Sequence, residues 1–178
     1  LRIMKKLHYI LFALLISFSI KTSAQSDTYA SKVKTLDSTI KTLYGVISGE
    51  KDEARDWELF KYLFLPEAKL IPTGTDKEGI HRAKFMTPQD YINSSGKMLV
   101  DIGFFEKEIA RTVHQFGNIA QVFTTYEAFN HTSKTTPIMS GINSIQMLYD
   151  NNRWWIVNIY WQQASKGNPI PKEFLPKH

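Results

Sequence analysis

Apolar positions between residues 27 and 48 recur every three or four residues, the spacing of one face of an α-helix. The stretch 56–65 has the same spacing and is followed by Pro66, which favours a helix end there. A third helix is predicted from Thr87, a good cap residue followed by proline, to about residue 100. We therefore expect three helices in the N-terminal part of the chain.

The pattern changes after residue 103 to runs rich in β-branched and aromatic residues, which are typical of strands. Asn151 and Asn152 lie between two of these runs and tolerate the positive φ of a tight hairpin turn. A short strand is expected over 68–72 and a polar loop over 73–85. Helices followed by antiparallel strands predict an α+β fold, with helices on one face of a curved sheet. The long strands are expected at 104–114, 118–129, 141–149 and 154–163.

The last expected strand is apolar at both odd and even positions, whereas a strand with one wet face alternates apolar and polar residues. We assign the wholly apolar set to the interior beneath the helices and the mixed set to a partner surface, which predicts a homodimer. The interior set is Trp155, Val157, Ile159 and Trp161. The dimer set is Trp154, Ile156, Asn158 and Tyr160.

The first residues have the pattern of a cleaved secretory signal peptide. Three basic residues precede the apolar run 9–20, and small residues stand at Thr22 and Ala24. The run is shorter than the ~20 apolar residues of a membrane-spanning helix, so no stable membrane anchor is expected after cleavage. We predict a signal peptide over 1–24, a domain over 25–163, and an extended, proline-containing tail over 164–178, with export to the periplasm or the extracellular space.

Removal of the signal segment changes the charge balance. It leaves 18 of the 22 basic residues against 17 acidic ones, so the remaining chain is nearly neutral and nucleic acid is not an expected partner. The chain has no cysteine, which excludes disulfides and thiolate chemistry. Its histidines do not have the spacing of common metal motifs, so neither a metal nor another cofactor is expected.

Two phrases of the sequence carry a family resemblance: "YGVISGEKDEARDWELFKYLFLPEAKLIP" (44–72) and "GINSIQMLYDNNRWWIVNIYWQ" (141–162). With the order of elements, they resemble the nuclear transport factor 2-like (SnoaL-like, ketosteroid isomerase-like) superfamily. The resemblance implies a cone, in which three N-terminal helices pack on a strongly curved, mainly antiparallel sheet and leave a pocket. The superfamily includes isomerases, dehydratases and cyclases as well as binding and assembly domains without catalysis, so the fold does not decide the function.

Ketosteroid isomerase chemistry needs an Asp base, a Tyr and a protonated Asp. On the resemblance, those positions fall near Pro72, Thr42 and Ser144, and none of the three can play its part. The sequence therefore favours a protein without that catalytic activity.

Glu127 is the best candidate for an acid that faces the pocket. The same family resemblance implies that Phe123, Thr125 and Glu127 point inward. A buried Glu127 would have a raised pKa and would serve as a general base; the alternative is a rim carboxylate paired with Arg111 or a lysine. His81, in the polar loop, is the second catalytic candidate.

The expected pocket is aromatic with a few polar groups, which is typical of a small-molecule site, although aromatic residues at such positions also build solid cores. We expect an exported domain that binds a small apolar or aromatic molecule. The alternatives are an isomerase, dehydratase or cyclase that uses Glu127 as base, and an assembly domain with a filled cone. The expected pocket residues are Trp57, Phe60, Phe64, Phe123, Thr125, Ser144, Gln146, Trp155, Ile159 and Trp161.

Overall fold

The computed structural model describes residues 28–177, so the predicted signal peptide over 1–24 lies outside the described residues. Helices α2 (Leu36–Ile47) and α3 (Trp57–Tyr62) come first in the chain. A longer helix follows β1 and β2 and is built from α4 (Pro88–Tyr91), the π-helical turn η1 (Ile92–Gly96) and α5 (Lys97–Asp101). Within the described range, no helix is long and apolar enough to cross a membrane.

The first helix is shorter than the apolar periodicity predicts. Residues 28–30 form a separate helical turn, and α2 begins after Thr35. The Thr35 hydroxyl accepts from the amide of Ser38, and the Ser38 hydroxyl accepts from the amide of Thr35. This capping box satisfies donors that a helix start leaves free, so it fixes the beginning of α2 inside the periodic run.

The second helix also ends earlier than expected. Asp56 caps it by accepting from the amide of Leu59 at 2.9 Å. The helix ends at Tyr62, and Pro66 lies inside the following strand, where the pairing register with β6 is interrupted. Because Pro66 falls in this interruption, its missing amide hydrogen costs no ladder hydrogen bond.

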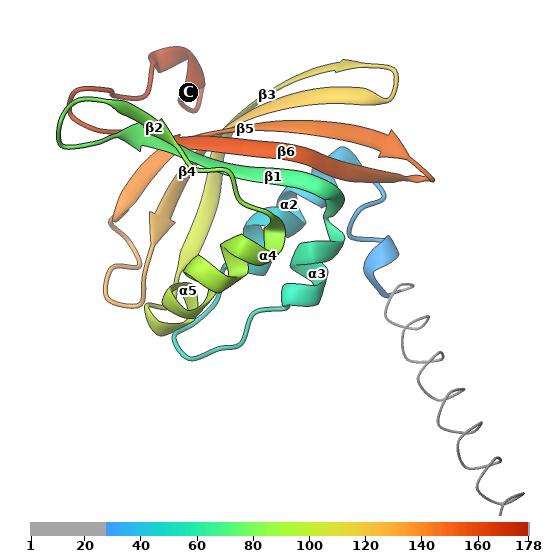
Figure 1. The fold of residues 1–178 in the computed structure, drawn as a ribbon, viewed down its shortest axis with the longest axis horizontal. Helices are drawn as coiled ribbons and strands as arrows, with labels where there is room; N and C mark the ends of the chain where they lie inside the picture. Colours follow the sequence, from blue (N-terminus) through green and yellow to red (C-terminus); the bar gives the residue numbers. More distant parts are fainter. Residues whose placement is uncertain (1–27, 178) are drawn as a thin grey trace, which may run out of the picture.

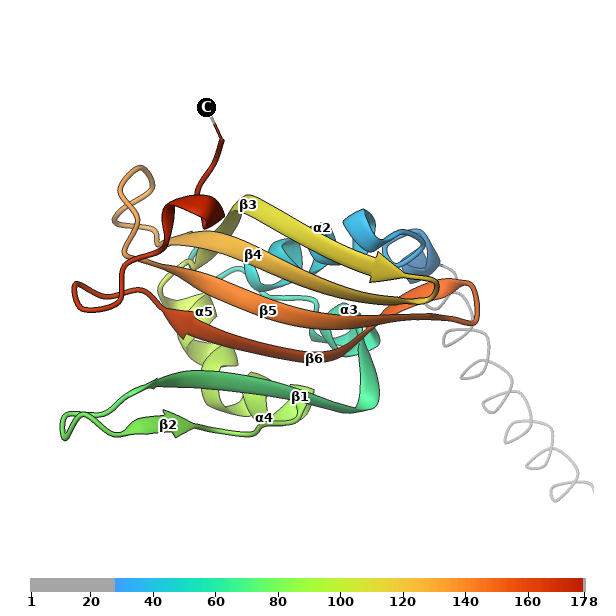
Figure 2. The same cartoon turned by 90° about the horizontal axis from the view of Figure 1, so that it is seen from above.

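The strands form one curled, unclosed sheet within residues 28–177, with the order β2-β1-β6-β5-β4-β3 (Figure 2). All neighbouring strands are antiparallel except β1 and β6, which are parallel. The predicted α+β class and the mainly antiparallel sheet are confirmed. The strands are β1 (Phe64–Thr75), β2 (His81–Ala83), β3 (Phe105–Phe116), β4 (Ile119–Phe129), β5 (Met139–Asp150) and β6 (Arg153–Gln163).

Two of the turns can be compared with the sequence. Asn151 and Asn152 have φ of 50° and 60°, which confirms the predicted tight hairpin between β5 and β6. The stretch 73–85 is not all loop, because β1 continues to Thr75 and pairs with the short strand β2. Amides of the connecting turn donate to the Asp76 carboxylate, which holds this hairpin together.

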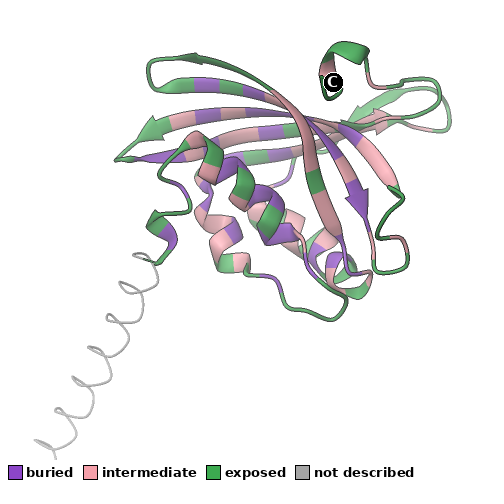
Figure 3. Ribbon diagram, turned by 180° about the vertical axis from the view of Figure 1, so that it is seen from behind, coloured by how far each residue is buried: buried purple, intermediate pink, exposed green. Residues whose placement is uncertain are grey.

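The helices cover one face of the sheet, and the C-terminal segment lies against the other (Figure 1). One side of α2 is buried against the sheet, and the purple segments of its ribbon in Figure 3 mark these residues. Fully buried side chains of both layers form the core, among them Ile40, Phe60, Leu63, Ile145 and Ile156.

Arg55 ties the loop between α2 and α3 to the rest of the helical layer. Its guanidinium is buried and donates to the carbonyls of Ile47, Gly49 and Leu99. Because these carbonyls belong to the end of α2 and to the short helix α5, one side chain joins the two helices.

The C-terminal segment after β6 folds back over the sheet. Its short helix η2 (Lys172–Phe174) lies on the face opposite the helices. The Phe174 ring packs 4.9 Å from the ring of Phe123, and the Thr125 hydroxyl donates to the Phe174 carbonyl at 2.5 Å. We call residues 164–177 the strap; it covers a sheet face that would otherwise be open to solvent.

Candidate functional site

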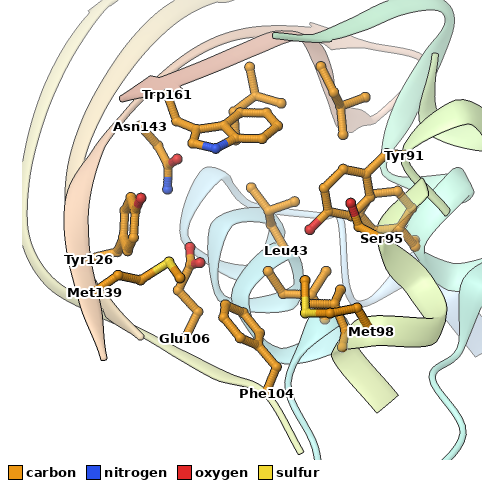
Figure 4. Close-up of a pocket in the computed structure, with 15 residues that line it drawn as sticks. Leu43, Tyr91, Ser95, Met98, Phe104, Glu106, Tyr126, Met139, Asn143 and Trp161 are labelled. Carbon is orange, nitrogen blue, oxygen red and sulfur yellow. The ribbon is translucent and has the colours of Figure 1, made fainter. Parts of the chain in front are cut away.

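A cavity of about 200 Å³ lies between the helices and the concave face of the sheet (Figure 4). Aliphatic and aromatic side chains make up most of its wall, and the polar groups are few. Such a lining is typical of a site for a small molecule. The residues of the wall are Leu43, Ile47, Phe60, Leu70, Tyr91, Ser95, Met98, Leu99, Phe104, Glu106, Tyr126, Met139, Asn143, Ile159 and Trp161.

Three polar side chains gather on the sheet side of this cavity. Glu106 comes from β3, Tyr126 from β4 and Asn143 from β5. In Figure 4 the Glu106 carboxylate points into the cavity toward Asn143 and Tyr126. A bulge after Glu108, where the register between β3 and β4 shifts, lies just beyond this group. We call Glu106, Tyr126 and Asn143 the polar wall.

Burial changes the acidity of Glu106. Loss of solvent raises the pKa of its carboxyl to about 7, and the hydrogen bond of Asn143 opposes part of that rise. The carboxyl is therefore present in both protonation states near neutral pH. In the protonated state it donates one hydrogen bond and accepts others, so it can pair with either a donor or an acceptor on a bound molecule.

The phenols of the cavity stay protonated at all ordinary pH values. Burial raises the pKa of Tyr126 and of Tyr91, and the nearby charge of Glu106 raises both further. Both hydroxyls therefore remain hydrogen-bond donors when Glu106 ionises. The charge of a deprotonated Glu106 would be held among neutral donors, without a basic side chain in the wall.

A buried chain of hydrogen bonds orients Asn143. Its amide nitrogen donates to the Tyr44 hydroxyl at 3.0 Å, and that hydroxyl lies 2.6 Å from the Thr124 hydroxyl. Since the Tyr44 oxygen accepts from Asn143, its own proton is free for Thr124. This arrangement fixes which end of the Asn143 amide faces the cavity, and burial raises the pKa of Tyr44 so that the phenol keeps its proton.

The opposite wall is aromatic. Tyr91 stacks on Phe60 with 5.4 Å between ring centres, and it meets the edge of Trp161 at 6.2 Å. Trp57 makes an edge-to-face contact with Phe60, with 5.8 Å between ring centres. The π-helical turn Ile92–Gly96 follows Tyr91 and brings Ser95 into the wall. Such turns inside α-helices are frequent at functional sites.

Several residues of the expected pocket are found at or beside this cavity. Phe60, Ile159 and Trp161 line it, and Trp57 and Phe64 contact Phe60 within the core.

The prediction of which β4 side chains point inward, toward the helices, is wrong. Val122, Thr124 and Tyr126 are turned inward, whereas Phe123 and Thr125 contact the strap on the outer face. Both sets contain large and polar residues, so alternation alone could not separate them. Gly141, the partner of Tyr126 on β5, was the useful signal: a Cβ there would lie 2.5 Å from the Tyr126 hydroxyl, so the glycine makes room for this ring.

The parity error moves both proposed catalytic residues away from the cavity. Glu127 is half-buried on the outer face, where its strand partner is Lys107, so it matches the alternative of a rim carboxylate better than that of a pocket base. His81 is exposed on β2, and its ring nitrogen lies 3.0 Å from the Thr75 hydroxyl. Neither residue lines the cavity.

On β5, Ser144 and Gln146 also face outward, because Asn143, Ile145 and Met147 take the inward positions. Gln146 donates to the Tyr160 hydroxyl on that outer face.

A bulge in β6 reverses the parity that the sequence predicts for its first half. Met147 pairs with Ile156 and Gln146 pairs with Asn158, which leaves Val157 as the extra residue. Before the bulge, Trp154 and Ile156 are buried in the core, so they do not belong to a dimer face.

Trp155 lies outside the cavity, and the Arg153 guanidinium stacks 3.5 Å over its ring. After the bulge, Ile159 and Trp161 face inward as predicted, and Asn158 and Tyr160 face outward.

The sequence did not identify Glu106, Asn143 or Tyr91 as site residues. Glu106 stands in a strand where charged residues occupy several neighbouring positions, and nothing in that pattern distinguishes the one that lines the cavity. No group of three or more side chains suited to hold a metal ion is found among residues 28–177.

Comparison with known proteins concerns the fold. A scan against protein-family models finds no match, and neither does a search of curated proteins. Among solved structures, a nuclear transport factor 2-like protein from Salmonella enterica has a TM-score of 0.51 at 20% identity, with 83% of this chain and 95% of that chain covered. A nuclear transport factor 2-like protein of unknown function from Pseudomonas putida has 0.54 at 10%, with 84% and 94% covered.

A third structure, a protein of unknown function with a cystatin-like fold from Nostoc punctiforme, has a TM-score of 0.54 at 11% identity, with 72% of this chain and 87% of that chain covered. These likenesses show the fold and leave the activity open.

Proposed function

We propose that this chain, which has the nuclear transport factor 2-like fold, binds a small and mainly apolar molecule in the cavity between helices and sheet. One observation carries the proposal: three polar side chains of a mainly apolar cavity, those of Glu106, Tyr126 and Asn143, meet on one wall. A solid core would have no reason to bury a carboxyl there, because burial of a charged group without a partner is costly.

The cavity limits the size of the molecule. About 200 Å³ is below the 300–1,000 Å³ that is usual for drug-sized ligands. A single substituted ring fits this range better than a fused polycyclic compound. Contact with Phe60, Tyr91 and Trp161 supplies apolar surface, at about 25 cal/mol for each Å² removed from water.

The polar wall limits the chemistry of the molecule. Tyr126 and protonated Glu106 are donors, so they suit a carbonyl or hydroxyl oxygen on the ligand. A ligand carboxylate is disfavoured, because no basic side chain lines the cavity and Glu106 is itself acidic. The expected ligand is therefore a neutral, compact molecule with one oxygen acceptor.

Cyclohexanone and cyclohexene form a matched pair of probes, because they share a six-membered ring and only the first has an oxygen. We expect cyclohexanone to bind more tightly at pH 6, by about 3- to 10-fold for one hydrogen bond. Glu106→Leu should reduce this difference, since Tyr126 remains as a donor, and Glu106→Gln should keep most of it because the amide still donates. Ligand-observed NMR measures both affinities.

Glu127→Gln is the control for this experiment, because Glu127 lies on the outer face. Equal binding of the two probes to the unmodified protein, or an undiminished difference in Glu106→Leu, would contradict the proposal. Mass spectrometry of protein purified from its source would then show directly whether a compound is retained.

A second candidate function is acid–base catalysis on a molecule bound in this cavity. The observation that favours it is the pKa of Glu106 at about 7, since a proton-transfer group works best when its pKa is near the working pH. In this reading Glu106 takes over the role that the sequence assigned to Glu127.

Deuterium exchange tests this candidate separately from binding. In heavy water, the Glu106 carboxylate would take an α-proton from cyclohexanone, the electron pair of the broken C–H bond would move toward the ketone oxygen, and a deuteron would return to the carbon. Catalysis would be supported if the α-proton NMR signal is lost faster with the protein than in buffer alone. Glu106→Gln should abolish this acceleration while the probe still binds. Binding without exchange would support ligand binding and contradict catalysis.

A further inference from the structure

A second cavity, of about 340 Å³, lies on the outer face of the sheet beneath the strap. The sheet separates it from the helix-side cavity, because the strap and the helices lie on opposite faces (Figure 1). Trp161 is common to the two walls, as expected for a residue of the strand between them. We call this space the strap cavity.

Three neighbouring strands build its floor. Phe123 on β4 pairs with Ser144 on β5, and Ser144 pairs with Tyr160 on β6. A small residue therefore stands between two aromatic ones in a row across the sheet. Directly opposed residues lie about 4.5–5.5 Å apart, so the two rings flank a depression above Ser144.

The strap forms the roof of this depression. Phe174 is held by its ring contact with Phe123 and by the hydrogen bond from Thr125 to its carbonyl. Pro169 and Pro171 line the same roof. Their fixed φ angles restrict the backbone of the strap, which favours a preformed cover over a freely moving tail.

Ser144 is the unusual feature of the strap cavity. Its residue is 3% exposed, and its hydroxyl has no hydrogen-bond partner among the described residues. A buried hydroxyl without a partner costs free energy, and most such groups in folded proteins find one. Ser144 lines the cavity while its hydroxyl oxygen is covered, so a χ1 rotation would turn the hydroxyl toward a bound molecule that supplies the missing partner.

The other lining residues define what that molecule would be. The wall holds aromatic, aliphatic and proline side chains with a few amides and hydroxyls, and none of the described residues in it is charged. Charged ligands would lose their hydration without a counter-charge in return. The ligand class is therefore neutral and aromatic, with one group that hydrogen-bonds to a hydroxyl.

We propose that the strap cavity is a second ligand site, which binds a neutral aromatic molecule between Phe123, Tyr160 and the strap and pairs its polar group with the Ser144 hydroxyl. This site is independent of the function proposed for the helix-side cavity, since Trp161 is the one described residue common to the two linings and the strap cavity lies on the other face of the sheet.

Phenol and toluene are suitable probes, because both are neutral single rings and only phenol has a hydroxyl. Titration of the isotope-labelled full chain, followed by amide NMR, locates each probe. We expect phenol to shift the amides of Ile142, Ser144 and Ile170, and to bind about 3- to 10-fold more tightly than toluene, as one hydrogen bond provides.

Two variants test the assignment. Ser144→Ala should lower the affinity for phenol to that for toluene and leave toluene unchanged. Phe174→Ala should weaken both probes, because it opens the roof. Glu106→Leu is the matched control at the helix-side cavity. It should not alter the amide shifts that either probe causes at Ile142 and Ile170.

Three results would overturn the proposal: shifts confined to residues of the helix-side cavity, equal affinity of phenol and toluene, or an unchanged phenol affinity in Ser144→Ala. Because Ser144→Ala removes only an unpaired hydroxyl, its folding is not in question, and thermal unfolding of the unliganded variant confirms this before the titration. Failure at the strap cavity would leave the cyclohexanone experiment at Glu106 unaffected, and the reverse also holds.

Discussion

Glu106 lies in an environment unlike that of an ordinary glutamate. Its carboxyl is turned into an apolar cavity and shares that space with two tyrosines, which raises its pKa to about 7 from the usual 4.5. Native proteins that bury an acid in this way accept a cost in stability at neutral pH. Such a cost is commonly found where a site has a function to perform.

The pH dependence of stability follows from this shift. Between about pH 4.5 and 7 the folded protein holds a proton on Glu106 that the unfolded chain has lost, so the free energy of unfolding should fall as the pH rises through this window. The total change attributable to Glu106 is on the order of 3 kcal/mol. Urea unfolding at pH 4.5, 6 and 7.5 measures it.

Glu106→Gln is the matched variant for this measurement, because glutamine has nearly the same volume and does not titrate. The difference between the unmodified protein and this variant isolates Glu106 from all other groups. If the difference in the free energy of unfolding is the same at all three pH values, then burial does not raise the pKa of Glu106 in the folded protein.

At the scale of elements, the bulge at Val157 decides which side chains of β6 enter the core. One extra residue opposite Gln146 and Met147 turns Trp154 and Ile156 inward together with Ile159 and Trp161. Continuous alternation would have placed these two pairs on opposite faces. The bulge therefore explains why both parities of this strand are apolar.

Truncation of two aromatic residues, one on each side of the bulge, should give unequal effects. Trp154→Ala should lower the free energy of unfolding by about 3–5 kcal/mol, since this side chain is buried in the core. Tyr160→Ala should cost under about 1 kcal/mol, because the ring is 39% exposed on the outer face. Chemical denaturation of both variants under the same conditions compares them; similar costs would argue against the bulge.

The sequence predicted most of the helices and strands. It did not predict, for most strands, which side chains point toward the helices. Thr87 with Pro88, and the Asn151–Asn152 turn, have local chemistry that fixes a helix start and a hairpin, and both are found as predicted. Which face of β4 or β5 lies inward depends on contacts that are distant in the sequence. Because the helices cover one face and the strap part of the other, large apolar residues occur on both.

The whole molecule has two cavities on the two sides of one sheet. The strap covers part of the outer face, so any second copy of the chain that docks there must contact the strap as well as β5 and β6. The homodimer stays a prediction, and its face does not include Trp154 or Ile156. Light scattering at micromolar concentration checks it, and a monomeric mass would count against it.

Export likewise stays a prediction, because the segment that carries it lies outside residues 28–177. Expression of the full chain in a bacterial host, followed by fractionation and mass spectrometry of the N-terminus, checks it. We expect a product that begins at Gln25 in the periplasmic or extracellular fraction. A chain that retains its first 24 residues in the cytoplasm would contradict the predicted cleavage.

The parallel pairing of β1 with β6 has a consequence for how the chain folds during synthesis. The contact between Lys69 and Asn158 spans 89 residues, and β1 is an inner strand of the sheet on that side. The ribosome must synthesise nearly all of the domain before β1 can pair with β6. Until then, amides and apolar side chains of β1 remain exposed. The pairing that shapes one wall of the cavity is thus also the step at which the nascent chain is most open to aggregation.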